Sequence, residues 1–298
     1  YVSTRGSAPV LGFADVVLAG LANDGGLYVP ESWPTLASHL GATYPELAAG
    51  VFAPYVGDDI AADTMLRLCR EAYATFRHPD VVPIVDLEPG HHLMELFHGP
   101  TLAFKDVALQ LLGRLFDHIL TERQQKVTIV GATSGDTGSA AIDGVKDCAN
   151  INIVILYPEG RVSEVQRRQM TTVNSPNVRT VAIDGTFDDC QDLVKAMFNH
   201  AEFREAQNLS AVNSINWARV MAQVVYYVEA TRRLGGPIDV TVPTGNFGNV
   251  LSGWIAKQMG APLRRLIVAS NDNDILTRFF NSHTMDVTGV HPGTPVTL

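Results

Sequence analysis

The 298-residue sequence contains few cysteines and no regular spacing of metal ligands. Its three cysteines, Cys69, Cys148 and Cys190, are odd in number and form no Cys-x-x-Cys pair, so we expect reduced and mostly buried thiols. The nine histidines include one adjacent pair, His91 and His92, which cannot both face one metal ion from a strand. These features argue against a metal site.

Positive charge and long apolar runs are also scarce. The chain carries 22 Lys and Arg residues against 31 Asp and Glu, a formal net charge of -9, which disfavours nucleic acid and anionic membrane as partners. No apolar run approaches the length of a membrane span, and no signal-peptide pattern opens the chain at Tyr1. We therefore expect a cytoplasmic protein, a monomer or homodimer, with a small-molecule substrate.

Residues 1–90 are expected to form a mainly helical N-terminal domain. Helical spacing of apolar residues predicts helices at residues 13–21, 44–52 and 60–76. The stretch between the first two, residues 23–34, is rich in Gly and Pro and predicts turns. By itself this segment indicates no function.

From residue 91 onward, short Val- and Ile-rich runs alternate with helical segments. The expected strands start at residues 127, 151, 178, 238 and 266, and the expected helices span residues 103–123, 137–145, 163–171, 188–200, 216–234, 250–259 and 275–281. This alternation is typical of a parallel sheet covered by helices on both faces. The sequence therefore predicts an α/β fold over residues 91–298, with a small subdomain at about 105–235 and part of a large one at about 236–298.

The stretch ELFHGPTLAFKD, residues 95–106, places a lysine at the start of a helix. We expect a short buried strand at residues 93–97, which the Gly-Pro pair at 99–100 ends. Residues 102–104 are apolar, and both desolvation and the helix dipole would then favour a neutral Lys105 amine. A neutral amine attacks carbonyl groups, as in Schiff-base chemistry. The alternative is a solvated first-turn lysine with Asp106 beside it.

The loop GATSGDTGSAA, residues 131–141, follows the strand that starts at residue 127. Hydroxyls and free backbone N–H groups at a helix N-terminus form an anion site, suited to a carboxylate or a phosphate. The residues that would supply them are Ser134, Gly135, Asp136, Thr137 and Gly138. A capped turn with Asp136 as a helix-start residue is an equally good interpretation.

A second loop, PTGNFGNV at residues 243–250, follows the strand that starts at residue 238. Gly245 and Gly248 let the backbone approach a ligand closely, and the N–H groups through Asn249 can surround a phosphate. The side-chain amides of Asn246 and Asn249 add donors. We favour a phosphate cradle over a plain turn.

Other polar residues are weaker candidates. One group lies where the helix at 216–234 begins: Asn213, Ser214, Asn216 and Arg219. For Arg219 an internal ion pair is favoured over anion binding. A second group, Arg161, Arg167 and Arg168, follows the strand that ends near residue 157. For these arginines a charged helix face is the favoured interpretation, and a phosphate clamp is the alternative.

A candidate amine, a carboxylate-sized loop and a phosphate cradle together indicate pyridoxal 5'-phosphate, which needs a lysine for its aldehyde and an N–H-rich pocket for its phosphate. Six motifs resemble the threonine synthase family of bacterial and fungal type: YVSTRG, DGGLYVPE, HGPTLAFKD, GATSGDTGSAA, NSINWAR and PTGNFGN. That family belongs to the tryptophan-synthase-β-like, fold type II pyridoxal-phosphate enzymes. The resemblance implies a lyase that converts O-phospho-L-homoserine and water to L-threonine and phosphate.

The resemblance also implies roles for individual residues. Lys105 would be the Schiff-base lysine. The residues holding the cofactor phosphate would be Gly245, Asn246, Phe247, Gly248 and Asn249. The residues binding substrate would be Ser134, Gly135, Asp136, Thr137 and Asn216, and related enzymes carry Asn where this chain has Asp136. Candidates for the leaving phosphate are Arg161, Asn213, Ser214 and Asn216.

Family members continue beyond the position of Leu298, and we expect that further stretch to supply strands and a Thr or Ser against the pyridine nitrogen. Two other functions stay open on the sequence. A threonine-synthase-like phospho-lyase would release a 2-oxoacid instead of threonine. A non-catalytic α/β binding protein would use the same glycine loops to hold a small molecule.

Overall fold

The computed structural model describes residues 1–133, 135–210, 216–243, 247–271, 274–286 and 288. The N-terminal region is mainly helical, as the sequence predicts. Its elements are β1 (Val2–Ser3), α1 (Phe13–Ala19), β2 (Tyr28–Val29), α2 (Tyr44–Val56), the 3-10 turn η1 (Gly57–Asp59) and α3 (Ala62–Tyr73). A capping box starts α2, because the Glu46 carboxylate accepts from the backbone N–H of Thr43 over 3.2 Å.

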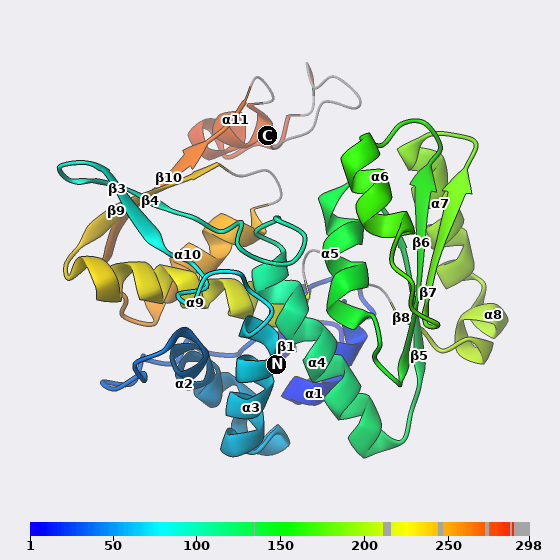
Figure 1. Ribbon diagram of the computed structural model, residues 1–298, viewed down its shortest axis with the longest axis horizontal. Coiled ribbons are helices and arrows are strands. Elements are labelled where there is room, and N and C mark those ends of the chain that lie inside the picture. Colours follow the sequence, from blue (N-terminus) through cyan, green and yellow to red (C-terminus); the bar gives the residue numbers. More distant parts are fainter. Residues whose placement is uncertain (134, 211–215, 244–246, 272–273, 287, 289–298) are drawn as a thin grey trace.

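A parallel four-stranded sheet forms the centre of the α/β region. Its strands lie in the order β7 (Val178–Ile183), β6 (Ile151–Pro158), β5 (Val127–Ala132) and β8 (Leu209–Ser210). Helices α5 (Asp136–Val145) and α6 (Glu164–Thr171) lie on one side of it, and α7 (Phe187–Asn199) and α8 (Ala201–Ala206) lie on the other (Figure 1). The prediction of an α/β fold with a covered parallel sheet is confirmed.

A second, two-stranded parallel sheet joins β9 (Ile238–Pro243) to β10 (Leu263–Ala269). The connection between them is α10 (Gly248–Gln258), and α11 (Ile275–Ser282) follows β10. The sheet lies on the other side of the molecule from the four-stranded sheet, with the long helix α4 (Asp106–Arg123) between them (Figure 1). Helix α9 (Trp217–Leu234) lies on the side of the two-stranded sheet and packs against both α4 and α10.

The expected buried strand at residues 93–97 is wrong. The strand is β4 (His91–Met94), which pairs antiparallel with β3 (Ile84–Glu88), and Leu93 and Phe97 are 46% and 48% exposed. The turn between the strands contains Gly90 at φ 80°, where glycine is favoured. The hairpin is exposed because its polar side chains pair across it, as in the 2.7 Å contact between His92 Nδ1 and Asp86 Oδ1.

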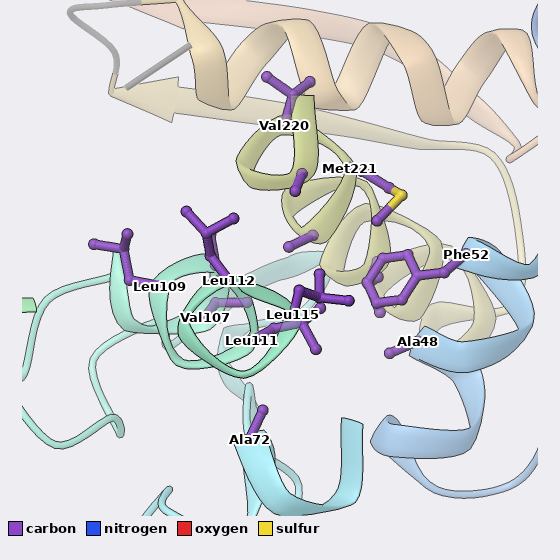
Figure 2. Close-up of a cluster of buried hydrophobic side chains, with 14 of the residues drawn as sticks. Ala48, Phe52, Ala72, Val107, Leu109, Leu111, Leu112, Leu115, Val220 and Met221 are labelled. Carbon is purple, nitrogen blue, oxygen red and sulfur yellow. The ribbon is translucent and has the colours of Figure 1, made fainter. Parts of the chain in front are cut away.

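The core is built around α4 and α9, which are buried on most of their surfaces. Figure 2 shows leucines of α4 packed with Val220 and Met221 of α9, Phe52 of α2 and Ala72 of α3. Burial of such side chains is the main stabilising term of a fold. The N-terminal helices and the α/β region therefore share one hydrophobic core.

Two glycines bring α4 and α5 into backbone contact. A Cβ added at Gly113 would lie 1.9 Å from the carbonyl oxygen of Gly144, and one at Gly144 would lie 2.5 Å from the carbonyl oxygen of Leu109. Only glycine allows this approach. The crossing fixes the relative position of the two helix N-termini, where Lys105 and Asp136 lie.

Within the described residues, no helix is long and apolar enough to cross a membrane.

Candidate active site

Lys105 is the N-cap residue of α4. The turn that precedes it is held by hydrogen bonds to the next residue, Asp106. The fully buried Asp106 carboxylate accepts hydrogen bonds from the Thr101 backbone N–H over 2.8 Å and from its hydroxyl over 2.7 Å. Burial raises the pKa of Asp106, while the bonds from Thr101 oppose that shift. A Cβ at Gly99 would lie 2.4 Å from the Asp106 Cβ, so the turn needs glycine there. The helix thus begins at Asp106 and not at residue 103, where the sequence placed it, since Leu102 has φ 64°.

The Lys105 amine is neither solvated nor in a purely apolar setting. Its Nζ donates to Oδ2 of Asp136 over 2.6 Å, and the lysine side chain is 19% exposed. The same atom lies 4.9 Å from the centre of the Phe104 ring. Both interpretations from the sequence missed this carboxylate partner, because it lies 31 residues away along the chain. Asp106, the neighbour considered there, is engaged with Thr101 instead.

The loop after β5 is tightened by Thr133, which sequence reasoning did not select. Its Oγ1 accepts from the backbone N–H of Gly135 over 3.2 Å and of Gly138 over 3.0 Å. The N-cap of α5 is Gly135, which has no side chain, and Thr133 instead caps the N–H of the third helical residue, Gly138. The Asp136 carboxylate turns to Lys105. A capped turn and an anion site therefore both stay open for this loop. Thr137 lies in the first turn of α5, and Ser134 falls outside the described residues.

Helix α6 links this loop to the lysine turn. Gln169 Nε2 donates to the backbone oxygen of Thr101 over 2.9 Å. One turn earlier, a Cβ added at Gly135 would lie 2.6 Å from Gln166 Nε2, so that glutamine lies directly against the loop. These two contacts hold residues 101 and 135 near one another.

Arg219 is the least expected part of the site. Its side chain is buried, at 3% exposure, and its Nε and Nη1 atoms have no hydrogen-bond partner among the described residues. Burial lowers the pKa of the guanidinium to about 10, which the negative charge of Asp136 opposes, so Arg219 is charged at neutral pH. The described residues show no ion pair at Arg219, and the predicted internal pair stays untested there. A buried cation with free donors is the place for an anion.

Asn216, predicted to bind substrate, has a structural position. Its Oδ1 accepts from the Ala218 backbone N–H and caps α9, while its Nδ2 donates to the Val17 carbonyl, each over 2.9 Å. Each end of the amide thus makes one bond inside the fold, and the assignment of Asn216 to the substrate stays a prediction. Its neighbours Asn213 and Ser214 lie outside the described residues.

The other predicted phosphate candidates lie on the surface. The Arg167 and Arg168 side chains pair with Glu164 of the same helix over 2.8 and 2.7 Å, which confirms the interpretation as a charged helix face. Arg161 is exposed, and its positive charge helps to lower the pKa of Asp189.

The predicted phosphate cradle lies at the start of α10. Phe247 is its N-cap in the left-handed region at φ 57°, and no side chain caps the helix. The Phe247 ring stacks on Phe280 of α11, with centroids 5.3 Å apart. Asn249 accepts two hydrogen bonds through Oδ1, from the hydroxyls of Tyr226 and Tyr227. Gly245 and Asn246 lie outside the described residues.

The donor set does not point to a metal, since the described residues contain no cluster of three or more His, Cys, Asp or Glu that could hold one. Pyridoxal phosphate fits the residues present on three observations. An amine lies beside a carboxylate at Lys105, the N-cap residue of α10, Phe247, makes no side-chain cap, and Arg219 has two buried donors without a partner among the described residues. A phosphorylated aldehyde and an anionic substrate would use all of them.

Comparison with known families defines the class. Residues 88–297 match the family described as "Pyridoxal-phosphate dependent enzyme", and residues 1–73 match "Threonine synthase N terminus". The chain therefore belongs to the pyridoxal-phosphate-dependent enzyme family.

The particular relatives are threonine synthases. The chain is 53% identical to threonine synthase of Pseudomonas aeruginosa over 98% of its own length and 64% of that protein. A crystal structure of pyridoxal-phosphate-bound threonine synthase from Brucella melitensis superimposes with a TM-score of 0.94 at 53% identity, covering 97% of this chain and 64% of that one. For threonine synthase from Escherichia coli the TM-score is 0.83 at 34% identity, covering 96% and 67%. The chain thus spans just under two thirds of the Pseudomonas and Brucella proteins.

Proposed function

We propose that this chain carries the cofactor and substrate site of a threonine synthase, which converts O-phospho-L-homoserine and water to L-threonine and phosphate. The observation that carries the proposal is the cluster at the N-termini of α4, α5 and α9. There the Lys105 amine lies 2.6 Å from Asp136, and the buried Arg219 guanidinium offers two unpartnered donors to an anion. The resemblance to threonine synthases supports the choice of substrate.

Bound pyridoxal phosphate would supply an aldehyde that joins to amines and a ring that takes up electron density from the substrate. Lys105 would hold the cofactor through that aldehyde. The residues that hold its phosphate would be Gly245, Asn246, Phe247, Gly248 and Asn249. Of these, the backbone N–H groups at the uncapped start of α10 support the assignment best.

Lys105 and the residues around it would transfer protons and bind the substrate carboxylate. Once the substrate amine has taken its place, the Lys105 amine takes the proton from the substrate Cα and returns it at the end. Asp136, within hydrogen-bond distance, accepts the proton that the lysine must lose before it can act as a base. The loop from Ser134 to Gly138 would bind the substrate carboxylate through backbone N–H groups and hydroxyls.

For the substrate phosphate we replace the candidates from the sequence with Arg219. Lys105 would also take a proton from Cβ, phosphate would leave from Cγ, Cγ would gain a proton to become the methyl group, and water would add its hydroxyl at Cβ. The charge on the departing phosphate needs a cation. Arg219 is buried, charged and without a partner among the described residues, whereas Arg161 is exposed. A guanidinium suits phosphate because its donors match the phosphate oxygens in pairs.

We also propose a cytoplasmic, monomeric or homodimeric protein. It would have an N-terminal domain at residues 1–90 and a catalytic region at residues 91–298, whose small subdomain spans about 105–235. The acidic composition and the absence of a CxxC pair support the location.

Product analysis tests the proposed reaction. Incubation of the protein with pyridoxal phosphate and O-phospho-L-homoserine should release threonine and inorganic phosphate in equal amounts. Release of phosphate with a 2-oxoacid instead would favour the phospho-lyase. Ligand binding that survives Lys105→Ala, with no turnover in the wild-type protein, would favour the binding protein.

A further inference from the structure

Two adjacent buried tyrosines of α9 hold one side chain at the start of α10. The hydroxyls of Tyr226 and Tyr227 donate to the same atom, Oδ1 of Asn249, over 2.5 and 2.8 Å. Among the described residues, the Tyr226 hydroxyl has one longer alternative acceptor, Gln223 Oε1 at 3.3 Å. An amide oxygen has two lone pairs, so the pair fills its acceptor capacity and turns the amide nitrogen away from α9.

Both tyrosines are fixed donors. They are 2% and 3% exposed, and burial raises the pKa of each phenol, so neither ionises near neutral pH. Consecutive helix positions point about 100° apart around the axis, so two neighbouring side chains seldom reach one atom. Here the rings converge with centroids 5.0 Å apart. The arrangement is therefore specific to Asn249.

The helix that carries Asn249 is shaped to receive these rings. A Cβ added at Gly253 would lie 2.8 Å from Cε1 of Tyr227, so glycine lets that ring approach α10 closely. Ser252 Oγ also lies 2.9 Å from the Val220 carbonyl of α9 and 2.8 Å from the Gly248 carbonyl. Helix α10 is thus tied to α9 by polar contacts at Asn249 in its first turn and at Ser252 in the next.

The contacts between α9 and α10 bear on Phe247, the residue that precedes α10. Phe247 holds a left-handed backbone, which costs about 1 kcal/mol or more for a residue that is not glycine and persists only when its surroundings fix it. The N–H groups of the uncapped helix start must point to one place to bind a phosphate. We propose that Tyr226 and Tyr227 are positioning residues for the cofactor phosphate, acting through Asn249 on the first turn of α10. This inference rests on the cofactor assignment made above.

The test separates an effect at the phosphate from a general loss of stability. Apparent dissociation constants for pyridoxal phosphate and for pyridoxal, which lacks the phosphate, are measured by absorbance titration of the apoprotein. In the double variant Tyr226→Phe, Tyr227→Phe we expect the preference for pyridoxal phosphate over pyridoxal to fall about tenfold, since two hydrogen bonds are lost. In the matched control Tyr44→Phe the preference should be unchanged, because the buried Tyr44 hydroxyl has no partner among the described residues.

Asn249→Leu gives an independent reading, since the tyrosines act only through the Asn249 amide. Asn249→Leu alone should lower the preference at least as much as the double tyrosine variant, and adding Tyr226→Phe and Tyr227→Phe to it should cause no further loss. An unchanged preference in the double tyrosine variant, or a further loss of about tenfold when its substitutions are added to Asn249→Leu, would overturn the positioning role while leaving the proposed function intact. A wild-type protein that binds no pyridoxal phosphate would overturn both.

Discussion

The Nζ atom of Lys105 lies 2.6 Å from Oδ2 of Asp136, and this contact joins the first turns of two helices that cross in backbone contact. The pair brings an amine and a carboxylate together beyond the carboxyl end of strand β5 of the parallel sheet. The lysine must lose a proton before its nitrogen can react with a carbonyl group or act as a base. Asp136 lies within hydrogen-bond distance of the amine, and we therefore propose that it accepts this proton in the reaction.

Asp136→Asn tests this role. The variant keeps the shape of the side chain but removes its charge and its capacity as a proton acceptor. We expect turnover to fall about 100-fold, the lower range for losing a group that handles protons. The absorbance band of lysine-bound pyridoxal phosphate should still form. The control is Asp192→Asn, which removes the partner of the exposed Lys195, 2.9 Å away, and should leave turnover unchanged. Equal turnover in wild type and Asp136→Asn would refute the role.

Arg219→Met should act in opposite directions on stability and on substrate affinity. Two donors of the buried guanidinium have no partner among the described residues, so its removal should leave the melting temperature of the apoprotein unchanged or raise it. The KM for the phosphorylated substrate should rise about 10- to 100-fold through the loss of charge-assisted hydrogen bonds.

Two matched variants sharpen the Arg219 test. Arg219→Lys keeps the charge without the paired donors and should lie between wild type and Arg219→Met. Arg168→Met removes an exposed arginine that pairs with Glu164 and should leave the KM unchanged. A KM equal to that of the wild type in Arg219→Met would contradict phosphate binding at this residue.

The crossing of α4 and α5 predicts a large effect from a single methyl group. In Gly113→Ala the new Cβ would lie 1.9 Å from the Gly144 carbonyl oxygen, and the helices would have to separate. We expect the free energy of unfolding to fall by about 2–3 kcal/mol, the upper range for overpacking. Gly236→Ala is the matched control, because a Cβ there meets nothing within 4 Å. Urea denaturation of both variants checks the difference.

Glu164 gives a prediction for acid pH. The side chains of Arg167 and Arg168 hydrogen-bond to its carboxylate and lower its pKa to about 2. A carboxyl whose pKa is lower in the folded state stabilises the protein above its unfolded pKa, and that contribution is lost as the pH falls through the folded value. The difference in free energy of unfolding between wild type and Glu164→Gln should therefore be constant above about pH 4.5 and vanish towards about pH 2. Since the group is exposed, the difference should be small and should shrink further in about 1 M salt. A difference that grows on acidification would contradict this assignment.

Local sequence signals predicted the elements of the fold well. The Val- and Ile-rich runs and the helical spacing predicted the parallel sheet and its helices, and glycine-rich loops marked the ends of β5 and β9. They failed at the hairpin of β3 and β4, where apolar residues such as Leu93 lie on the surface because cross-strand polar pairs and a glycine turn, not burial, define the hairpin.

For the candidate site, the sequence predicted individual residues and loops but not the contacts between them. Lys105 and the loop around Asp136 could be selected, but their contact joins positions 31 residues apart, and no local pattern encodes it. The role of Arg219 depends on the absence of a partner among the described residues, which appears only once neighbouring elements are packed. The same holds for Tyr226 and Tyr227, which look like ordinary core residues in the sequence and reach Asn249 only because α9 and α10 pack together.

The most direct test of the account is the visible absorbance band that pyridoxal phosphate gives when its aldehyde is joined to a lysine amine. We expect the wild-type protein to gain this band on addition of the cofactor, and Lys105→Ala to lose it. Lys195→Ala, which removes an exposed lysine paired with Asp192, should keep it. A band that persists in Lys105→Ala, or that never forms in the wild-type protein, would contradict the central claim that Lys105 holds the cofactor.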